Sequence, residues 1–193
     1  MEIKKENAIA AYNAANEDTR KVLLSLLPEL EEEIRPKNIT ERVKTFEDAC
    51  RELGDEHPFV LAYQSVNLCN PEITENNRDI IAYMKLRIIC AALNEGWEPQ
   101  FTENEERWYP WFSLWTEKEL SRKIDEWKAD HRLTSTGDYS GDFAGFAFEV
   151  SHYAPLNTTA RVGSRLCFKS EALATYCGKQ FISLWADFNL IRK

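Results

Sequence analysis

The sequence has few of the features that would specify a chemistry. No two of its five cysteines lie closer than ten positions, so the C-x2-C pairs typical of structural zinc sites do not occur. Glycine is scarce, with 7 residues in 193, and neither a Walker-type loop nor a G-x-G-x-x-G motif is present. The H-E-x-x-H, G-x-S-x-G and nucleobase-deaminase signatures are missing too. No motif specifies a reaction or a cofactor.

Long apolar runs are also absent. A membrane span needs about 18 consecutive apolar residues. The best candidate, Ile80 to Leu93, is shorter and contains Lys85 and Arg87. The first residues, M-E-I-K-K-E-N, lack the apolar core of a signal peptide. We therefore expect a cytoplasmic protein without a membrane partner.

Positive charge is in deficit overall, but it is unevenly distributed. The net charge of −8 argues against an indiscriminate nucleic-acid binder. From Val150 to the end, however, six basic residues face two acidic ones, so this part carries +4 and the first 149 residues carry −12. The charge distribution is therefore compatible with a local basic surface in the C-terminal part of the chain.

Apolar content is sufficient for a sizeable core, because hydrophobic residues make up 44% of the chain and charged residues 29%. Most of the cysteines stand at apolar helix or strand positions, where a free thiol behaves as a small hydrophobic group. We expect free, buried thiols at the five positions Cys50, Cys69, Cys90, Cys167 and Cys177.

The stretch from Arg78 to Trp115 organises the chain. Residues Asn76–Asn94 are apolar on almost every face, with a narrow polar seam through Arg78, Lys85 and Arg87. Such a helix belongs inside a core, with other elements packed around it. Gly96 suits the left-handed residue that follows a helix end.

The residues before this helix predict further helices. We expect one over residues 5–15, a second capped by Asp18 and stopped by Pro28, and a solvated acidic loop from Glu29 to Glu33. Thr45 and Asp48 resemble a capping box for a helix that Gly54 ends. Pro58 suits the first position of the next helix, with His57 before it as a cap.

The residues after the central helix predict a small antiparallel sheet. The expected strands are Trp97–Phe101, Trp108–Trp115, Phe143–Tyr153 and Ala160–Lys169. The expected helices are one capped by Thr116 and Glu119, which continues through Trp127, and a last one capped by Ser170, with Gly178 at a close backbone approach. A loop is expected from Leu133 to Asp142.

This order predicts an α+β fold. Residues 1–36 form a helical appendage, and residues 37–193 form one domain with a helical part over about 37–96 and a sheet-containing part over about 97–193. In the third strand, Phe146, Phe148, Val150 and His152 should share an apolar face, so His152 is expected to be a core histidine.

Four of the six tryptophans fall between Trp97 and Trp115. Large aromatics usually belong to the core, but W-Y-P-W-F-S-L-W is too dense to bury every ring on one side of a strand. The candidates for a partner-binding surface are Trp97, Trp108, Tyr109, Trp111 and Phe112.

Two polar groups are candidate sites. Strand spacing would place Arg161, Arg165 and Lys169 on one face, with Tyr153 beside them, where they could meet phosphates or form an ordinary solvated face. Asp138, Asp142 and Glu149 could hold a hard cation, although a polar turn explains the same residues.

Three segments carry a resemblance. They begin at I-T-E-R-V-K-T-F-E-D-A-C, at L-R-I-I-C-A-A-L-N-E-G-W and at G-S-R-L-C-F-K-S-E-A-L, and they lie between Ile39 and Asp187. In these the chain resembles a family of small uncharacterised proteins from gut-bacterial phages and mobile elements. The resemblance implies a phage or prophage accessory, replication or virion-associated setting, and it implies no activity or site residue.

Three functions are compatible with these observations. The first is a non-enzymatic accessory protein that binds a protein partner, or itself, through the aromatic surface. The second is a single-stranded nucleic-acid binder that uses the basic strand face. The third is a metal-dependent hydrolase centred on the carboxylates.

Overall fold

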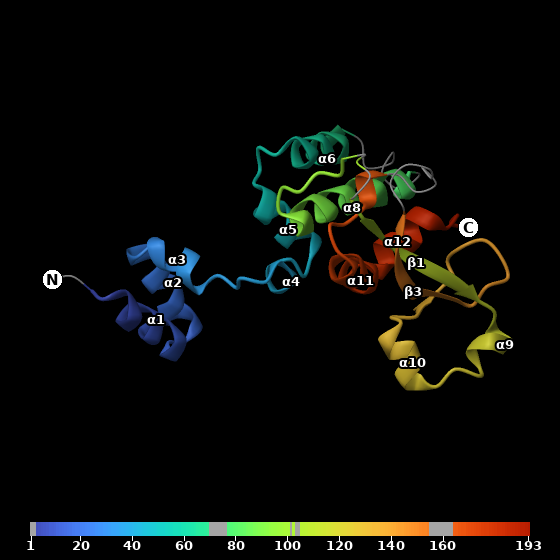
Figure 1. The fold of residues 1–193 in the computed structure, drawn as a ribbon, viewed down its shortest axis with the longest axis horizontal. Helices are drawn as coiled ribbons and strands as arrows, with labels where there is room; N and C mark the ends of the chain where they lie inside the picture. Colours follow the sequence, from blue (N-terminus) through green and yellow to red (C-terminus); the bar gives the residue numbers. More distant parts are fainter. Residues whose placement is uncertain (1–2, 70–76, 101, 103–104, 155–163) are drawn as a thin grey trace. The chain divides into compact units, whose positions relative to one another are not determined.

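The computed structural model describes residues 3–69, 77–100, 102, 105–154 and 164–193. They fall into two compact units, Met1–Arg42 and Val43–Lys193, so the division comes after Arg42 rather than after residue 36. The second unit contains a small antiparallel sheet in addition to helices, which confirms the predicted α+β class (Figure 1).

The first unit is helical. It contains α1 (Lys5–Ala14), α2 (Glu17–Leu26), α3 (Glu29–Ile34) and the short α4 (Ile39–Arg42). The cap of α2 is Asn16, whose side chain accepts a hydrogen bond from the Thr19 N–H at 2.9 Å, and not Asp18 as expected. The acidic run forms α3 instead of a loop. Three of its four glutamates, Glu29, Glu31 and Glu32, lie in the first helical turn, where the helix dipole favours negative charge, and Leu30 is buried.

The core of the second unit surrounds α8 (Arg78–Asn94), as predicted. This helix packs against α5 (Phe46–Leu53), α6 (Pro58–Cys69) and α12 (Ile182–Asn189). The fully buried side chains of α8 include Leu86, Ile88, Ile89 and Leu93. Lys85, which belongs to the polar seam, contacts other side chains, because its ammonium lies over the rings of Phe46 and Tyr63.

Local signals for helix ends are mostly confirmed in this unit. Thr45 and Asp48 form the expected capping box of α5, which ends at Gly54 with φ +85°. Pro58 begins α6, and His57 Nδ1 accepts a hydrogen bond from the Phe59 N–H at 3.2 Å. At the end of α8, both Glu95 and Gly96 adopt positive φ, so the left-handed turn is two residues long.

The sheet has three strands in the order β1-β3-β2, all antiparallel. They are β1 (Arg107–Trp115), β2 (Thr134–Ser135) and β3 (Gly145–Ala154). The register jumps between Trp111, opposite Val150, and Phe112, opposite Phe148. Glu149 is therefore an extra residue in β3, a β-bulge.

The bulge overturns the expected alternation of β3. Phe148 and Ser151 both face α11 (Glu171–Gln180), with the Ser151 hydroxyl 2.9 Å from the Thr175 hydroxyl. Val150 and His152 point away and are exposed. His152 is thus not a core histidine, because one inserted residue reverses the face of every residue after it.

Two expected strands are corrected. Residues 97–100 are not a strand, and Phe101 lies outside the described residues. In the second, residues 160–163 also lie outside them, and Ser164–Leu166 is a 3-10 helix, η1. Of residues 164–169, which the structure describes, only Phe168 pairs, in a single antiparallel bridge with Trp108.

Two expected helices are each divided. Thr116 and Glu119 form the predicted capping box, but α9 (Glu117–Leu120) and α10 (Asp125–Asp130) are separated by an extended Ile124. The last helix bends at Phe181, between α11 and α12. The expected close approach at Gly178 is confirmed, because a Cβ there would lie 2.7 Å from the Phe148 ring and from Pro110 Cβ.

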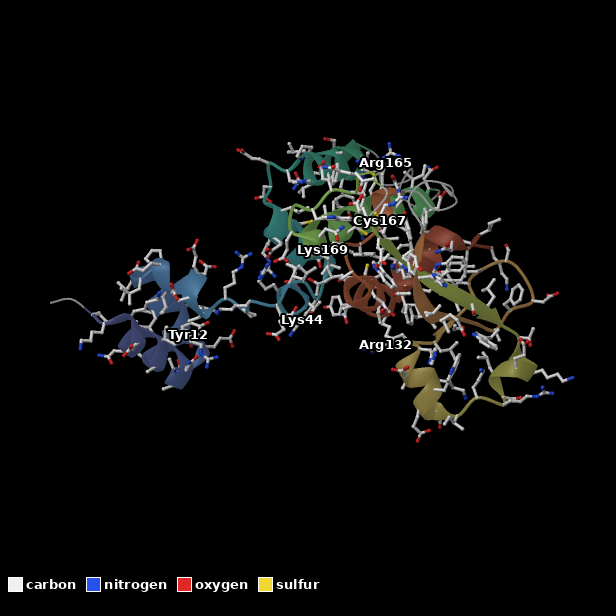
Figure 2. The ribbon with its side chains drawn as sticks, in the orientation of Figure 1. Tyr12, Lys44, Arg132, Arg165, Cys167 and Lys169 are labelled. Carbon is white, nitrogen blue, oxygen red and sulfur yellow. The ribbon has the colours of Figure 1, made fainter. Side chains whose placement is uncertain are left out.

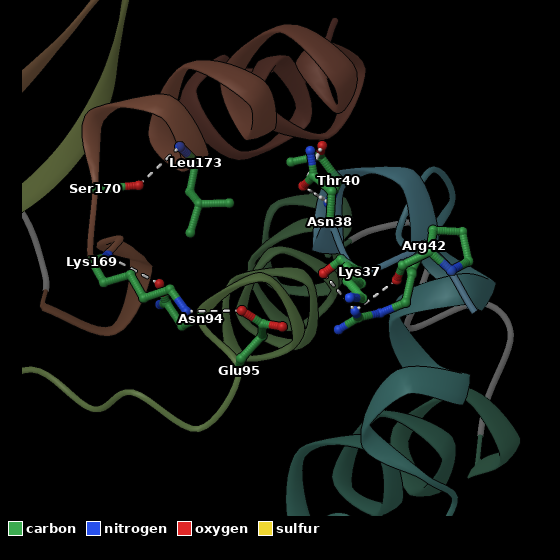
Figure 3. Close-up of polar contacts among 10 residues, drawn as sticks. Lys37, Asn38, Thr40, Arg42, Asn94, Glu95, Lys169, Ser170 and Leu173 are labelled. Atoms are coloured by element: carbon green, nitrogen blue, oxygen red, sulfur yellow. Dashed lines mark hydrogen bonds and ion pairs between the residues drawn. The ribbon is translucent and has the colours of Figure 1, made fainter. Parts of the chain in front are cut away.

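A buried carboxamide connects the end of α8 to the segment after η1. Asn94 is 4% exposed and donates to the Cys167 carbonyl at 2.8 Å. Its side-chain oxygen accepts from the Lys169 N–H at 3.0 Å (Figure 3). The Lys169 ammonium then pairs with Glu95 at 3.0 Å. Cys167 to Lys169, with the bridging Phe168 between them, are therefore held against α8.

We expect Asn94→Ala to lower the free energy of unfolding by about 2–4 kcal/mol, since it removes both buried hydrogen bonds of the carboxamide, to the Cys167 carbonyl and from the Lys169 N–H. Lys169→Met is the matched control, because it removes only the half-exposed ion pair with Glu95 and should cost less than about 1 kcal/mol. Urea denaturation of both variants measures the difference. Equal losses would contradict the role given to the carboxamide.

Candidate functional site

Among the residues that the structure describes, the outer edge of β1 has no backbone partner beyond Trp108. Trp108 exchanges two backbone hydrogen bonds with Phe168, at 2.9 and 3.0 Å, so its N–H and C=O point away from β3. At the other end of β1, the Trp115 carbonyl accepts from Ala144, which lies on the β3 side. Backbone direction alternates along a strand, so Phe112 and Leu114 also point outward. Among the described residues, no backbone group outside the sheet bonds to either of them.

A groove of about 450 Å³ lies beside this edge. β1, η1, α8 and α12 all contribute to it, and most of its side chains are apolar. Its lining residues are Tyr83, Pro110, Trp111, Phe112, Leu114, Phe146, Arg165, Leu166, Trp185, Phe188, Asn189 and Leu190. The open backbone groups of β1 are thus bordered by an aromatic surface, which we call the β1 groove.

The aromatic rings of the β1 groove are fixed by one another. The Phe112 ring stacks on Phe146, with centroids 4.7 Å apart, and lies 5.3 Å from Trp185. Tyr83 stacks on Phe188 at 5.9 Å. Trp111 differs, because 53% of its surface is exposed although it is a large hydrophobic side chain. An exposed tryptophan at the rim of a rigid aromatic wall is typical of an interaction surface.

The aromatic candidates from the sequence separate into three environments. Trp111 and Phe112 line the β1 groove. Tyr109 is 3% exposed, so it is not available to a partner and that expectation is corrected. Trp108 lies against Tyr153, with ring centroids 5.3 Å apart, and Trp97 lines a second cavity.

The described residues of the predicted basic strand, 164–169, do not form a basic strand face. Arg161 lies outside the described residues, Arg165 is in a 3-10 helix, and Lys169 pairs with Glu95. Figure 2 shows Arg165, Cys167 and Lys169 along one segment beside α8. Arg165 is exposed and lines both the β1 groove and the second cavity. Tyr153 stays beside Trp108.

The carboxylate candidates are not gathered into a metal site. Within the described ranges, no group of three or more His, Cys, Asp or Glu side chains is placed to hold a metal ion. Asp138 and Asp142 flank the turn near Tyr139, whose hydroxyl donates to Asp187 at 2.9 Å, and Glu149 stands in the bulge of β3. The described part of the structure therefore contains no carboxylate group of the kind that the hydrolase hypothesis requires.

The thiols of Cys90, Cys167 and Cys177 are free and buried, as expected, and Cys50 is half-buried. The side chain of Cys69 lies outside the described residues. Burial raises the pKa of Cys167 to about 11, although a hydrogen bond with the Tyr109 hydroxyl opposes the shift. Burial, together with the neighbouring Cys177, also raises the pKa of Cys90 well above its usual value. These thiols stay protonated at neutral pH and behave as core groups rather than nucleophiles.

Several groove residues were missed because they are distant from β1 in sequence. Trp185 is in α12 and Tyr83 in α8. Phe188 is near the end of α12. The sequence predicts an apolar stripe along the last helix, through Leu173, Cys177, Phe181, Leu184 and Phe188. A stripe of this kind indicates burial but not which residues border a groove.

Comparison of the chain with protein-family models, with curated proteins and with solved structures finds no match. A search of the described helices for one that is both long and apolar enough to cross a membrane finds none.

We predict that stability falls as pH rises from 9 to 11. A thiol with pKa 9.0 unfolded and about 11 folded stabilises the native state below pH 9, and this contribution is lost as pH passes through the folded pKa. Cys167 would account for up to about 3 kcal/mol. Urea denaturation at pH 7, 9 and 10.5 measures the loss, which should be smaller in Cys167→Ala. Parallel pH curves for the two proteins would contradict the prediction.

Proposed function

We propose that this chain is a non-enzymatic protein-binding module that takes up an extended segment of a partner polypeptide along the open edge of β1. The observation that carries the proposal is the outward backbone of Phe112 and Leu114 beside the β1 groove. An extended segment would add a strand through main-chain hydrogen bonds and place alternate side chains in the groove.

The chemistry of the edge favours such a partner over a small molecule. Each outward residue offers an N–H and a C=O with the spacing of a strand, and a polypeptide backbone complements that pattern. Pro110 lacks an N–H, which limits added pairing to the part of the edge nearer Leu114. The aromatic wall would receive apolar side chains at every second position of the partner.

The phage or mobile-element setting is part of this proposal and is supported by the resemblance in sequence alone. An accessory protein of that kind would act through a host or phage partner rather than by a reaction of its own. Self-association through two β1 edges is the rival outcome, which sedimentation of the chain alone would reveal as a dimer.

The proposal predicts that peptides selected from a display library of random 12-residue peptides on the immobilised chain bind through the β1 groove. We expect Trp111→Ala to weaken the selected peptides about tenfold or more, since exposed tryptophans often dominate interfaces. Tyr153→Ala removes another exposed aromatic, outside the groove, and should leave binding unchanged. Fluorescence anisotropy of labelled peptides measures both.

The role of the backbone is tested by Leu114→Pro against Leu114→Ala. Both lose the leucine side chain, but only proline removes the outward N–H, which is not used in pairing with β3. Thermal unfolding checks that both variants fold. Equal affinity of the peptides for Leu114→Pro and Leu114→Ala would contradict binding by strand addition. Unchanged affinity of the selected peptides for Trp111→Ala would contradict binding in the β1 groove.

A further inference from the structure

A second cavity, of about 260 Å³, lies on the other side of Arg165 from the β1 groove. It is bordered by the loop before α6, the C-terminal half of α8, residues 96–99 and the segment after η1. Its polar and aromatic lining includes His57, Phe59, Arg87, Trp97 and Arg165. We call it the Arg87 cavity. All of these residues belong to the second unit.

Two guanidinium groups contribute to the Arg87 cavity. Arg87 is half-buried, and its guanidinium carbon lies over the Phe59 ring, 3.9 Å from the ring centroid. Arg165 is exposed. In the described part of the chain, neither group forms an ion pair with a carboxylate. The charge of both arginines is therefore available to an anion.

Neither of the described acidic residues near these arginines forms an ion pair with them. Glu95 is engaged by Lys169 at 3.0 Å, and Glu98 lines the cavity with an exposed side chain that pairs with no described cation. His57 accepts the Phe59 N–H through Nδ1, so its neutral ring carries a proton on Nε2. The lining thus has more donors than acceptors.

Aromatic side chains supply the other half of the site. Phe59 is held between Arg87 on its face and His57, whose ring meets it edge-on at 4.9 Å. The Trp97 side chain is half-buried beside the cavity, and the Trp97 backbone N–H donates to the Asn94 backbone carbonyl at 3.0 Å. Flat aromatic surfaces next to cations are suited to a planar ring that carries a negative group.

We propose that the Arg87 cavity binds a single nucleotide, with the phosphate between Arg87 and Arg165 and the base against Trp97. Guanidinium groups recognise phosphate through paired hydrogen bonds, and the cavity that holds them has a volume of about 260 Å³. The nucleotide is either free or the 5′-phosphorylated end of a single strand. The site does not depend on the β1 groove being a docking surface.

Isothermal titration of the full chain with AMP, UMP, adenosine and inorganic phosphate tests the proposal. A nucleotide should bind at least about tenfold more tightly than its nucleoside or than phosphate, because each of these lacks one half of the recognition. Equal binding of AMP and adenosine would overturn the proposal, as would no heat with either nucleotide at millimolar concentration.

Variants localise the binding. Because Arg165 is exposed, Arg165→Gln should leave folding intact while weakening the affinity for AMP about tenfold or more. Arg87→Lys should weaken the affinity for AMP similarly, because it removes the planar guanidinium. Arg122→Gln, an exposed arginine outside the cavity, is the matched control. Binding that survives Arg165→Gln and Arg87→Lys would place the nucleotide elsewhere and contradict the proposal.

Affinities for single-stranded oligonucleotides with a 5′-phosphate or a 5′-hydroxyl distinguish a free nucleotide from the phosphorylated end of a strand. Tighter binding of the phosphorylated strand than of AMP identifies a strand end, and the reverse identifies a free nucleotide. Peptide binding by Arg87→Lys separates this site from the proposed function, because Arg87 does not line the β1 groove and that affinity should not change.

Discussion

The hydrogen bonds of the Asn94 carboxamide are the constraint on which both candidate sites depend. They attach Cys167 and Lys169 to the end of α8, and Phe168 between them pairs with Trp108. Because that bridge is a single one, the rest of the outer β1 edge has no backbone partner in the part of the chain that the structure describes. The same attachment sets the position of η1, which carries Arg165 between the β1 groove and the Arg87 cavity.

The buried character of α8 makes this arrangement rigid. A helix covered by α5, α6 and α12 cannot shift without disturbing the core, so its C-terminal asparagine is a fixed point for a segment more than seventy positions away. The β-bulge at Glu149 has a comparable effect on the sheet. It turns Ser151 toward α11 and leaves Val150 and His152 at the surface near Trp111.

The parts of the fold that were predictable from sequence depend on local signals. The capping boxes at Thr45 and Thr116 and the apolar run of α8 concern residues within a few positions of each other. The bulge and the bend at Phe181 arise from packing between distant elements, and no local pattern indicates them. For the site, Trp111 and Phe112 were identified by density of aromatics, but their neighbours on α8 and α12 could not be.

The most direct test of an open β1 edge is amide hydrogen exchange of the chain without a partner, resolved by residue. The N–H groups of Trp111 and Ser113 point toward β3 and should exchange slowly, whereas those of Phe112 and Leu114 should exchange much faster. A selected peptide should then protect Phe112 and Leu114. Strong protection of these two amides in the chain alone, at monomeric concentration, would contradict the account, because the edge would already be paired.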